Sequence, residues 1–241
     1  DYDHHEIYKS RKEYVEAFKQ FLGQSNQSLV WQSDLTANKF QLKPTDTLLD
    51  DNAILLNSLS NIGQVNRRNA YQVLVAASIL TSKKPVSMKP QIEAFPGLSR
   101  RFEKISDGLY TDYAHTIPKI AGCLQLAREV SENVVVVYEP LTNRRQHFVL
   151  EEYKHLFEGV KKLYWVPSYL AREDPEQKIL SPKELVSHLA NQEIAQPAEL
   201  NDQLKQNIQD HLAKGDVVVC MSGGGGASLD EWLREEFSQK S

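Results

Sequence analysis

The second half of the chain alternates short, wholly apolar segments with amphipathic helical patterns, and this alternation constrains the fold more than any other feature of the sequence. Helical spacing of apolar residues occurs near 117–129, 149–158, 182–190, 199–213 and 228–237. Between and before these stretches lie candidate strands at 110–112, 134–137, 163–166 and 217–221. Short apolar strands between helices are typical of a parallel sheet covered on both faces. We therefore predict an α/β fold in which residues 91–241 form an open, Rossmann-like sheet.

Residues 1–90 carry a different pattern, with two amphipathic helices and two short strands. Ser10 and Glu13 form a capping box at the start of a helix over 10–22, and a second apolar helical face covers 66–80. Leu29–Trp31 and Phe40–Leu42 are predicted strands. The Lys- and Pro-containing stretch 83–90 breaks the pattern. We place a domain boundary there, with one domain over 1–90 and another over 91–241.

The composition favours a globular protein whose partner is a small molecule. Of the 241 residues 25% are charged, and the formal net charge is −4. Acidic and basic residues are mixed along the chain, which argues against a nucleic-acid or membrane surface. No apolar run approaches the ~18–20 residues of a membrane-spanning helix, and the first residues lack the order of a signal peptide. We expect a cytoplasmic location, with Cys123 and Cys220 in the core.

Ligands of open α/β sheets bind beyond the carboxyl ends of the strands, so the segments after the predicted strands are the candidate site. Asp112 and His115 follow the first of these strands; a carboxylate there suits a ribose hydroxyl pair, and an imidazole suits a phosphate or carboxylate. Two pairs of cations, Arg100–Arg101 and Arg144–Arg145, suit bidentate capture of phosphate or carboxylate. Surface ion pairs are the alternative interpretation of each pair.

Two further segments allow two interpretations each. The run Gly223–Gly226 lies between a strand and a helix, where it is either a loop whose backbone N–H groups bind an anion or a flexible turn. Asp3–Glu6 offers ligands for part of a Mg²⁺ or Zn²⁺ site, or is a solvated polar segment. No G-x-x-x-x-G-K-[ST] phosphate loop occurs in the sequence.

Segments spread over nearly the whole chain resemble, in the same order, the motifs of the Mur ligases of peptidoglycan synthesis. Phe95–Glu103 is similar to the family's F-x-G-x-x-R-R-F-E, and Asp112–Thr116 falls at its D-D-Y-A-H-H. The other similar segments are Asp1–His4 (end of N-I-D-x-D-H), Gly63–Ala70 (G-x-H-N-x-x-N-A), Tyr169–Glu173 (Y-x-A-x-E) and Gly215–Gly224 (G-D-x-x-x-x-M-x-x-G). Residues 1–90 would then be the C-terminal portion of the central ATPase domain, and 91–241 the C-terminal domain.

The resemblance implies an ATP- and Mg²⁺-dependent ligase of cell-wall biogenesis that joins L-alanine to UDP-N-acetylmuramate through an acyl phosphate. Because the sequence opens without Met in the middle of a motif and has no phosphate loop, we expect part of a longer enzyme that is inactive alone. Two alternatives remain. Tyr138–Asn143 and Met221–Gly224 are also similar to the F-E-P-R-S-N and M-S-N-G-G of the muropeptide-recycling ligases, which add a tripeptide. The other alternative is a non-catalytic, nucleotide-binding remnant.

Carried over by position, the resemblance assigns roles to seven residues. They are His4 (Mg²⁺ ligand), Asn66 and Asn69 (adenine), Arg101 (nucleotide), Asp112 (ribose), His115 (catalytic, at the phosphate edge) and Arg145 (amino acid carboxylate). Within these motifs the sequence departs from the family at four positions, which are Val65, Thr111, Leu141 and Thr142. The last two replace the His and Arg of F-Q-P-H-R, so the identity of the added amino acid stays open.

Overall fold

The computed structural model describes residues 7–171 and 173–237. The chain divides into two compact units between Phe95 and Pro96, five residues beyond the boundary expected from the sequence. Each unit is described by itself. No helix in the described ranges is both long and apolar enough to cross a membrane.

The N-terminal unit contains a two-stranded parallel sheet and several helices. Its elements are α1 (Arg11–Gln24), β1 (Leu29–Trp31), α2 (Gln32–Asn38), β2 (Thr47–Leu49), α3 (Ile54–Asn57), α4 (Gln64–Thr81), the 3₁₀ helix η1 (Pro85–Met88) and α5 (Lys89–Glu93). The helices at 10–22 and 66–80 and the strand at 29–31 are confirmed, and the Ser10 side chain caps α1.

The strand predicted at Phe40–Leu42 is wrong. Lys39 ends α2 in a left-handed conformation with φ of 52°, so the chain leaves the helix through a turn and continues as coil. Asp46 then accepts hydrogen bonds from the backbone N–H groups of Ser28 and Lys43, both at 2.8 Å. This contact sets the register in which Leu29 pairs with Thr47, so the second strand begins only there.

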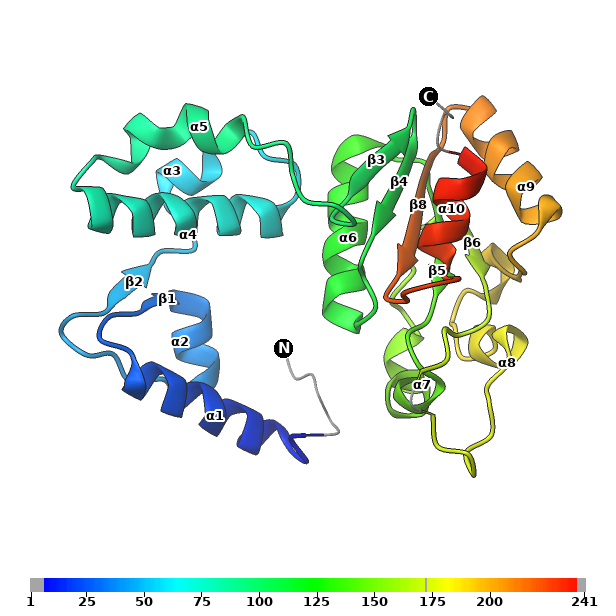
Figure 1. Ribbon diagram of the computed structural model, residues 1–241, viewed down its shortest axis with the longest axis horizontal. Helices are drawn as coiled ribbons and strands as arrows, with labels where there is room; N and C mark the ends of the chain where they lie inside the picture. The colour runs from blue at the N-terminus through cyan, green and yellow to red at the C-terminus, as the bar shows by residue number, and fades with distance from the viewer. Residues whose placement is uncertain (1–6, 172, 238–241) are drawn as a thin grey trace. The chain divides into compact units, whose positions relative to one another are not determined.

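The C-terminal unit is built around a six-stranded sheet with helices on both faces (Figure 1). In chain order it comprises β3 (Glu103–Ser106), β4 (Leu109–Asp112), α6 (Ile117–Val130), β5 (Val134–Glu139), α7 (Asn143–Val149), η2 (Leu150–Tyr153), β6 (Lys162–Trp165), α8 (Pro182–Val186), η3 (Gln192–Ile194), β7 (Ala195–Pro197), α9 (Asp202–Ala213), β8 (Val217–Ser222) and α10 (Leu229–Phe237). The strand order is β3-β4-β8-β5-β6-β7, and only β3 is antiparallel to its neighbour. The predicted α/β class is confirmed.

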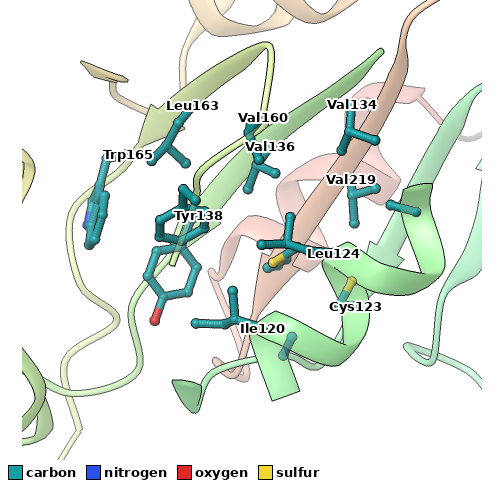
Figure 2. Close-up of a cluster of buried hydrophobic side chains, with 14 of the residues drawn as sticks. Ile120, Cys123, Leu124, Val134, Val136, Tyr138, Val160, Leu163, Trp165 and Val219 are labelled. Atoms are coloured by element: carbon teal, nitrogen blue, oxygen red, sulfur yellow. The ribbon is translucent and has the colours of Figure 1, made fainter. Parts of the chain in front are cut away.

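Alternate residues of the central strands fill two separate cores. Val134, Val136 and Tyr138 of β5 pack on the side that α6 covers, together with Trp165 (Figure 2). Val135 and Val137 point to the other side, where α9 and α10 contribute leucines and an isoleucine. Each fully buried aliphatic side chain contributes about 1.5–3 kcal/mol, so these runs without polar residues are stable only with helices on both faces.

The sequence misplaced one helix and missed two edge strands. The helix predicted at 149–158 is wrong, since the chain there forms the end of α7, then η2 and turns. The N-terminus of α7 lies earlier because Glu173 accepts hydrogen bonds from the N–H groups of Asn143 and Arg144, at 3.1 and 3.0 Å. The edge strands β3 and β7 have few apolar residues, so no periodic pattern indicates them.

Candidate functional site

Three strands of the C-terminal unit end side by side in polar residues. Asp112 ends β4, Glu139 ends β5 and Ser222 ends β8. In the register of the sheet Asp112 lies opposite Met221, and Glu139 lies opposite Ser222. The segments that follow these strands therefore meet at one edge, as the parallel topology requires.

Asp112 holds the backbone of the preceding loop and is itself an unusual acid. Its Oδ2 accepts a hydrogen bond of 2.8 Å from the Phe102 N–H. Burial raises the pKa of Asp112 to about 6, although this hydrogen bond and the nearby charge of Arg101 oppose the shift. A partly buried carboxyl group with a perturbed pKa at a strand end is a functional-site candidate.

His115 is buried against the glycine loop, with its two ring nitrogens in different surroundings. Nδ1 lies 2.7 Å from the Tyr113 carbonyl oxygen, which can only accept, so Nδ1 carries the proton and donates. Nε2 then presents its lone pair toward Nζ of Lys119, 3.4 Å away. The imidazole therefore has a fixed tautomer and a fixed orientation.

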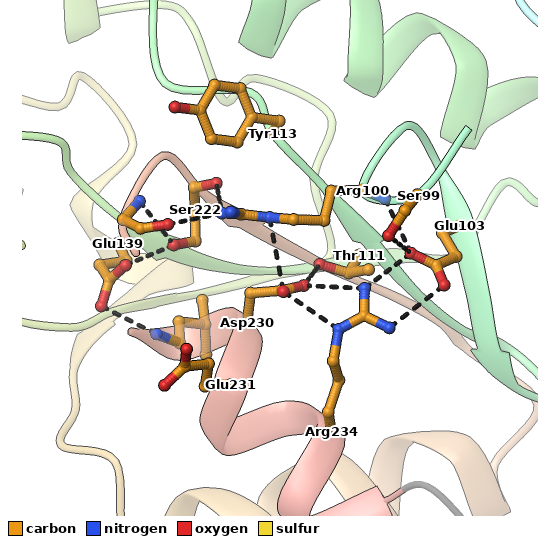
Figure 3. A network of polar contacts seen from close by, with 12 residues as sticks. Ser99, Arg100, Glu103, Thr111, Tyr113, Glu139, Ser222, Asp230, Glu231 and Arg234 are labelled. Carbon is orange, nitrogen blue, oxygen red and sulfur yellow. Dashed lines mark hydrogen bonds and ion pairs between the residues drawn. The ribbon is translucent and has the colours of Figure 1, made fainter. Parts of the chain in front are cut away.

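The two arginines of the predicted cation pair have different surroundings. Arg100 donates from Nη2 to the carbonyl oxygens of Ser222 and Gly224, at 2.9 and 2.8 Å, so it ties two loops together (Figure 3). Arg101 is exposed, and its guanidinium lies over the Tyr113 ring, 5.2 Å from the ring centre. Within the described ranges, that guanidinium makes no hydrogen bond or ion pair. Arg101 is thus the member of the pair that is available to a ligand.

The glycine run is packed closely at its start and open at its end. A Cβ on Gly223 would lie 2.8 Å from Cβ and Cγ of His115, and one on Gly224 would lie 2.6 Å from the Tyr169 ring. The Leu229 N–H at the start of α10 donates to Glu139 Oε1 at 2.9 Å, and Ser222 Oγ donates to the other oxygen of the same carboxylate. The protein's own carboxylate thus takes the place of the anion considered for this helix N-terminus.

A pocket of about 350 Å³ opens beside Glu139, at the carboxyl ends of β5 and β6. Its lining residues include two acidic ones, Glu139 and Glu199, together with Ser168 and Tyr169 and the aliphatic residues Val166, Leu170 and Leu200. Polar and apolar residues contribute about equally to its lining. Burial raises the pKa of Glu139, opposed by its hydrogen bonds to Ser222 and Leu229.

The other expected site residues lie elsewhere. Arg145 is half-buried on α7, close enough to the buried phenols of Tyr138 and Tyr153 to influence their pKa values, and it is not among the residues that line the pocket. Asn66 and Asn69 are exposed on α4 of the N-terminal unit. His4 falls outside the described residues. Among residues 7–171 and 173–237, no three His, Cys, Asp or Glu side chains gather where they could hold a metal ion.

Four residues that shape this edge are not among the site residues named from the sequence. Glu139 follows the apolar run of β5, and a charged residue directly after such a run is a usable indication. Glu173 stands in the sequence only as the last residue of a motif, and its capping of α7 depends on a distant loop. Asp230 and Arg234 are four residues apart on α10, a spacing that resembles any surface ion pair.

Comparison with known proteins gives consistent sequence matches. No family model matches the chain. It is 28% identical over 174 residues to UDP-N-acetylmuramate–L-alanine ligase of Cereibacter sphaeroides (strain ATCC 17029 / ATH 2.4.9), a match that covers 69% of this chain and 37% of that protein. A match to the ligase of the same name from Lactobacillus acidophilus is 23% identical and covers 93% of this chain and 56% of the relative. The chain thus spans between a third and just over half of the length of these curated relatives.

Solved structures show the same fold. The UDP-N-acetylmuramate–alanine ligase of Thermotoga maritima superposes with a TM-score of 0.62 at 19% identity, over 97% of this chain and 56% of that one. MurF from Acinetobacter baumannii gives a TM-score of 0.64 at 11% identity, over 95% and 56%. The sequence matches confirm the resemblance inferred from the motifs: the chain is similar, over part of their length, to UDP-N-acetylmuramate–L-alanine ligases, and the solved structures share its fold.

Proposed function

We propose that this chain supplies nucleotide- and acceptor-binding residues to an ATP-dependent ligase of peptidoglycan precursor synthesis, which joins L-alanine to UDP-N-acetylmuramate through an acyl phosphate. One observation carries the proposal. Arg101, Asp112 and His115 come from one short stretch around β4, and their cationic, carboxylate and imidazole groups suit the phosphates and ribose of one nucleotide. The matched relatives are ligases of this name, and they support the assignment.

In this proposal each side chain has one task. The exposed Arg101 guanidinium neutralises phosphate oxygens, and the Asp112 carboxylate accepts protons from the ribose hydroxyls. His115, oriented by the Tyr113 carbonyl, would accept at Nε2 from the Lys119 ammonium group and hold it at the phosphate edge, where that positive charge would stabilise a developing negative charge. Asn66 and Asn69 would contact the adenine. His4, which lies outside the described residues, would be a ligand of the Mg²⁺ ion that accompanies the nucleotide.

The pocket beside Glu139, which Arg145 does not line, is a second candidate position for the acceptor. The second candidate of the same class is a ligase that adds a tripeptide, because the Y-E-P-L-T-N segment also resembles the corresponding segment of those ligases. L-alanine and a tripeptide are therefore both acceptors to be tested.

The test of the proposed function is the binding of Mg·ADP to the 241-residue chain, followed by NMR. We expect saturable binding with shifts at the amides of 100–102 and 112–115. Because the sequence has no phosphate-loop motif, we expect the chain alone to release no phosphate from ATP. Absence of binding at millimolar ADP, or shifts confined to other segments, would reject the proposal.

Nucleotide binding is expected to weaken as the pH falls through the pKa of Asp112. The pKa of this carboxyl is raised to about 6 by burial, so its charged form, which accepts the ribose hydroxyls, declines below that pH. We expect ADP affinity to fall about fivefold between pH 7 and pH 5 beyond the change seen with Asp112→Asn. The variant should bind about tenfold more weakly than the wild type at pH 7.5.

The same variant reports on folding. Because the folded pKa lies above the value of 3.8 for the unfolded chain, Asp112 stabilises the fold at acid pH and this contribution is lost as the pH rises through about 6. At pH 7.5 the free energy of unfolding of Asp112→Asn should therefore equal or exceed that of the wild type. If Asp112→Asn is less stable than the wild type at pH 7.5, or binds ADP with wild-type affinity, then Asp112 serves only to hold the backbone of Phe102.

Arg145 is predicted to bind the acceptor carboxylate. Arg145→Lys loses the planar fork that makes two parallel hydrogen bonds, so the acceptor constant should rise about tenfold while the ADP constant stays nearly the same. Chemical-shift titration with L-alanine, and separately with a tripeptide, measures this. An equal change for both ligands, or none, together with a loss of stability, would show that Arg145 serves the buried Tyr138 and Tyr153 instead.

A further inference from the structure

We propose that Arg234 of α10 is a positioning residue: through Glu103 it holds the loop 99–102 in the shape that leaves Arg101 exposed to a ligand. The role of Arg101 in nucleotide binding rests on the proposed function. The fixing of the loop is a separate statement about this fold and is tested separately below.

Arg234 joins two carboxylates that come from distant parts of the C-terminal unit (Figure 3). Its Nη1 and Nη2 donate to the two oxygens of Glu103 on β3, at 3.1 and 2.6 Å. Its Nε donates at 3.1 Å to Asp230, one turn earlier on its own helix. A two-point contact between a planar guanidinium and a carboxylate fixes orientation as well as distance.

Glu103, held by Arg234, in turn binds the loop 99–102. Its Oε2 accepts hydrogen bonds from the Arg100 N–H at 2.7 Å and from Ser99 Oγ at 2.9 Å. The loop needs such support, because Arg100 and Phe102 have φ of 57° and 50°. Left-handed backbone at a residue other than glycine costs on the order of 1 kcal/mol and persists only where its surroundings hold it.

Asp230, which Arg234 contacts, also forms an ion pair with the side chain of Arg100. The carboxylate lies 3.4 Å from Arg100 Nε and accepts a hydrogen bond of 2.6 Å from the buried Thr111 hydroxyl. Arg100 is thus bound at its backbone through Glu103 and at its guanidinium through Asp230 and the glycine loop. Arg234 contacts both carboxylates, so one cation on α10 couples the two ends of this arrangement.

The experiment measures amide hydrogen exchange and ADP affinity in the 241-residue chain. In Arg234→Gln we expect the Arg100 amide to exchange at least tenfold faster and ADP to bind about tenfold more weakly, a loss of about 1.4 kcal/mol. Arg234→Lys keeps the charge without the fork and should lie in between. The matched control is Lys205→Gln, which removes a 2.6 Å ion pair between α9 and Glu236 of the same helix α10.

A double-mutant cycle tests whether Arg234 acts through Glu103. In the double variant Glu103→Gln/Arg234→Gln, the exchange rate of the Arg100 amide should not exceed the rate in whichever single variant exchanges faster. Additive effects, or an Arg234→Gln variant with the exchange of the Lys205→Gln control, would overturn the proposal. If the wild type does not bind ADP but the exchange results hold, the proposed function fails while the positioning of the loop stands.

Discussion

Gly223→Ala is expected to destabilise the C-terminal unit by about 1–3 kcal/mol and to abolish ADP binding. An added Cβ would lie 2.8 Å from both Cβ and Cγ of His115, and because His115 Cβ is fixed to the backbone the clash cannot be relieved by rotation of a flexible end. The imidazole would have to leave the Tyr113 carbonyl, so its tautomer and orientation would no longer be set. Urea denaturation followed by circular dichroism, and ADP titration, measure the two effects.

Gly226→Ala is the matched control for this prediction. A Cβ at that position lies 4.0 Å from its nearest neighbours, the carboxylate oxygens of Glu231, which is ordinary contact. We expect a change within about 0.5 kcal/mol and unchanged ADP binding. Equal effects of the two substitutions would mean that the loop needs glycine for its backbone freedom and not for its contact with His115.

Trp165→Ala should lower the free energy of unfolding by about 3–5 kcal/mol, the largest stability effect that we predict. The side chain is fully buried at the end of β6, and its ring makes edge contacts with Tyr138, Tyr153 and Phe157, with centroids 5.0 to 5.7 Å apart. The indole N–H has no hydrogen-bond partner in the described part of the chain. The loss is therefore one of packing, and Trp165→Phe should recover most of it.

Ile179→Ala provides the comparison for Trp165→Ala in the same unit. Ile179 is 55% exposed, so truncation removes little buried surface and should change stability by less than about 0.5 kcal/mol. A Trp165→Ala variant that unfolds at the same urea concentration as the wild type would show that the ring contacts of Trp165 with Tyr138, Tyr153 and Phe157 do not stabilise the unit.

The parts of the fold that follow from local pattern were predictable, and those fixed by distant contacts were not. The apolar runs of β5 and β8 and the helices α6, α9 and α10 were expected because burial on a regular face leaves a period in the sequence. The start of α7 depends on Glu173, which comes 30 residues after Asn143 in the chain. No periodicity carries information over that distance.

The same distinction applies to the candidate site. Parallel topology alone places the residues after β4, β5 and β8 at one edge, so the order of strands and helices along the chain is enough to select Asp112, His115 and the glycine run. The unequal roles of Arg100 and Arg101 could not be predicted, because two adjacent arginines are chemically identical in the sequence. They differ through the partners of Arg100 on β8, in the glycine loop and on α10, which lie more than a hundred positions away.

The position of β8 has a consequence for how the unit is made. It is the last strand along the chain, yet it lies between β4 and β5 and pairs with both. While the polypeptide emerges from a ribosome, β4 and β5 have no common neighbour until residues 217–222 appear. The facing edges of β4 and β5 therefore stay unpaired until the final part of the domain is synthesised. A chain truncated before residue 217 should aggregate through these edges instead of forming a smaller folded sheet.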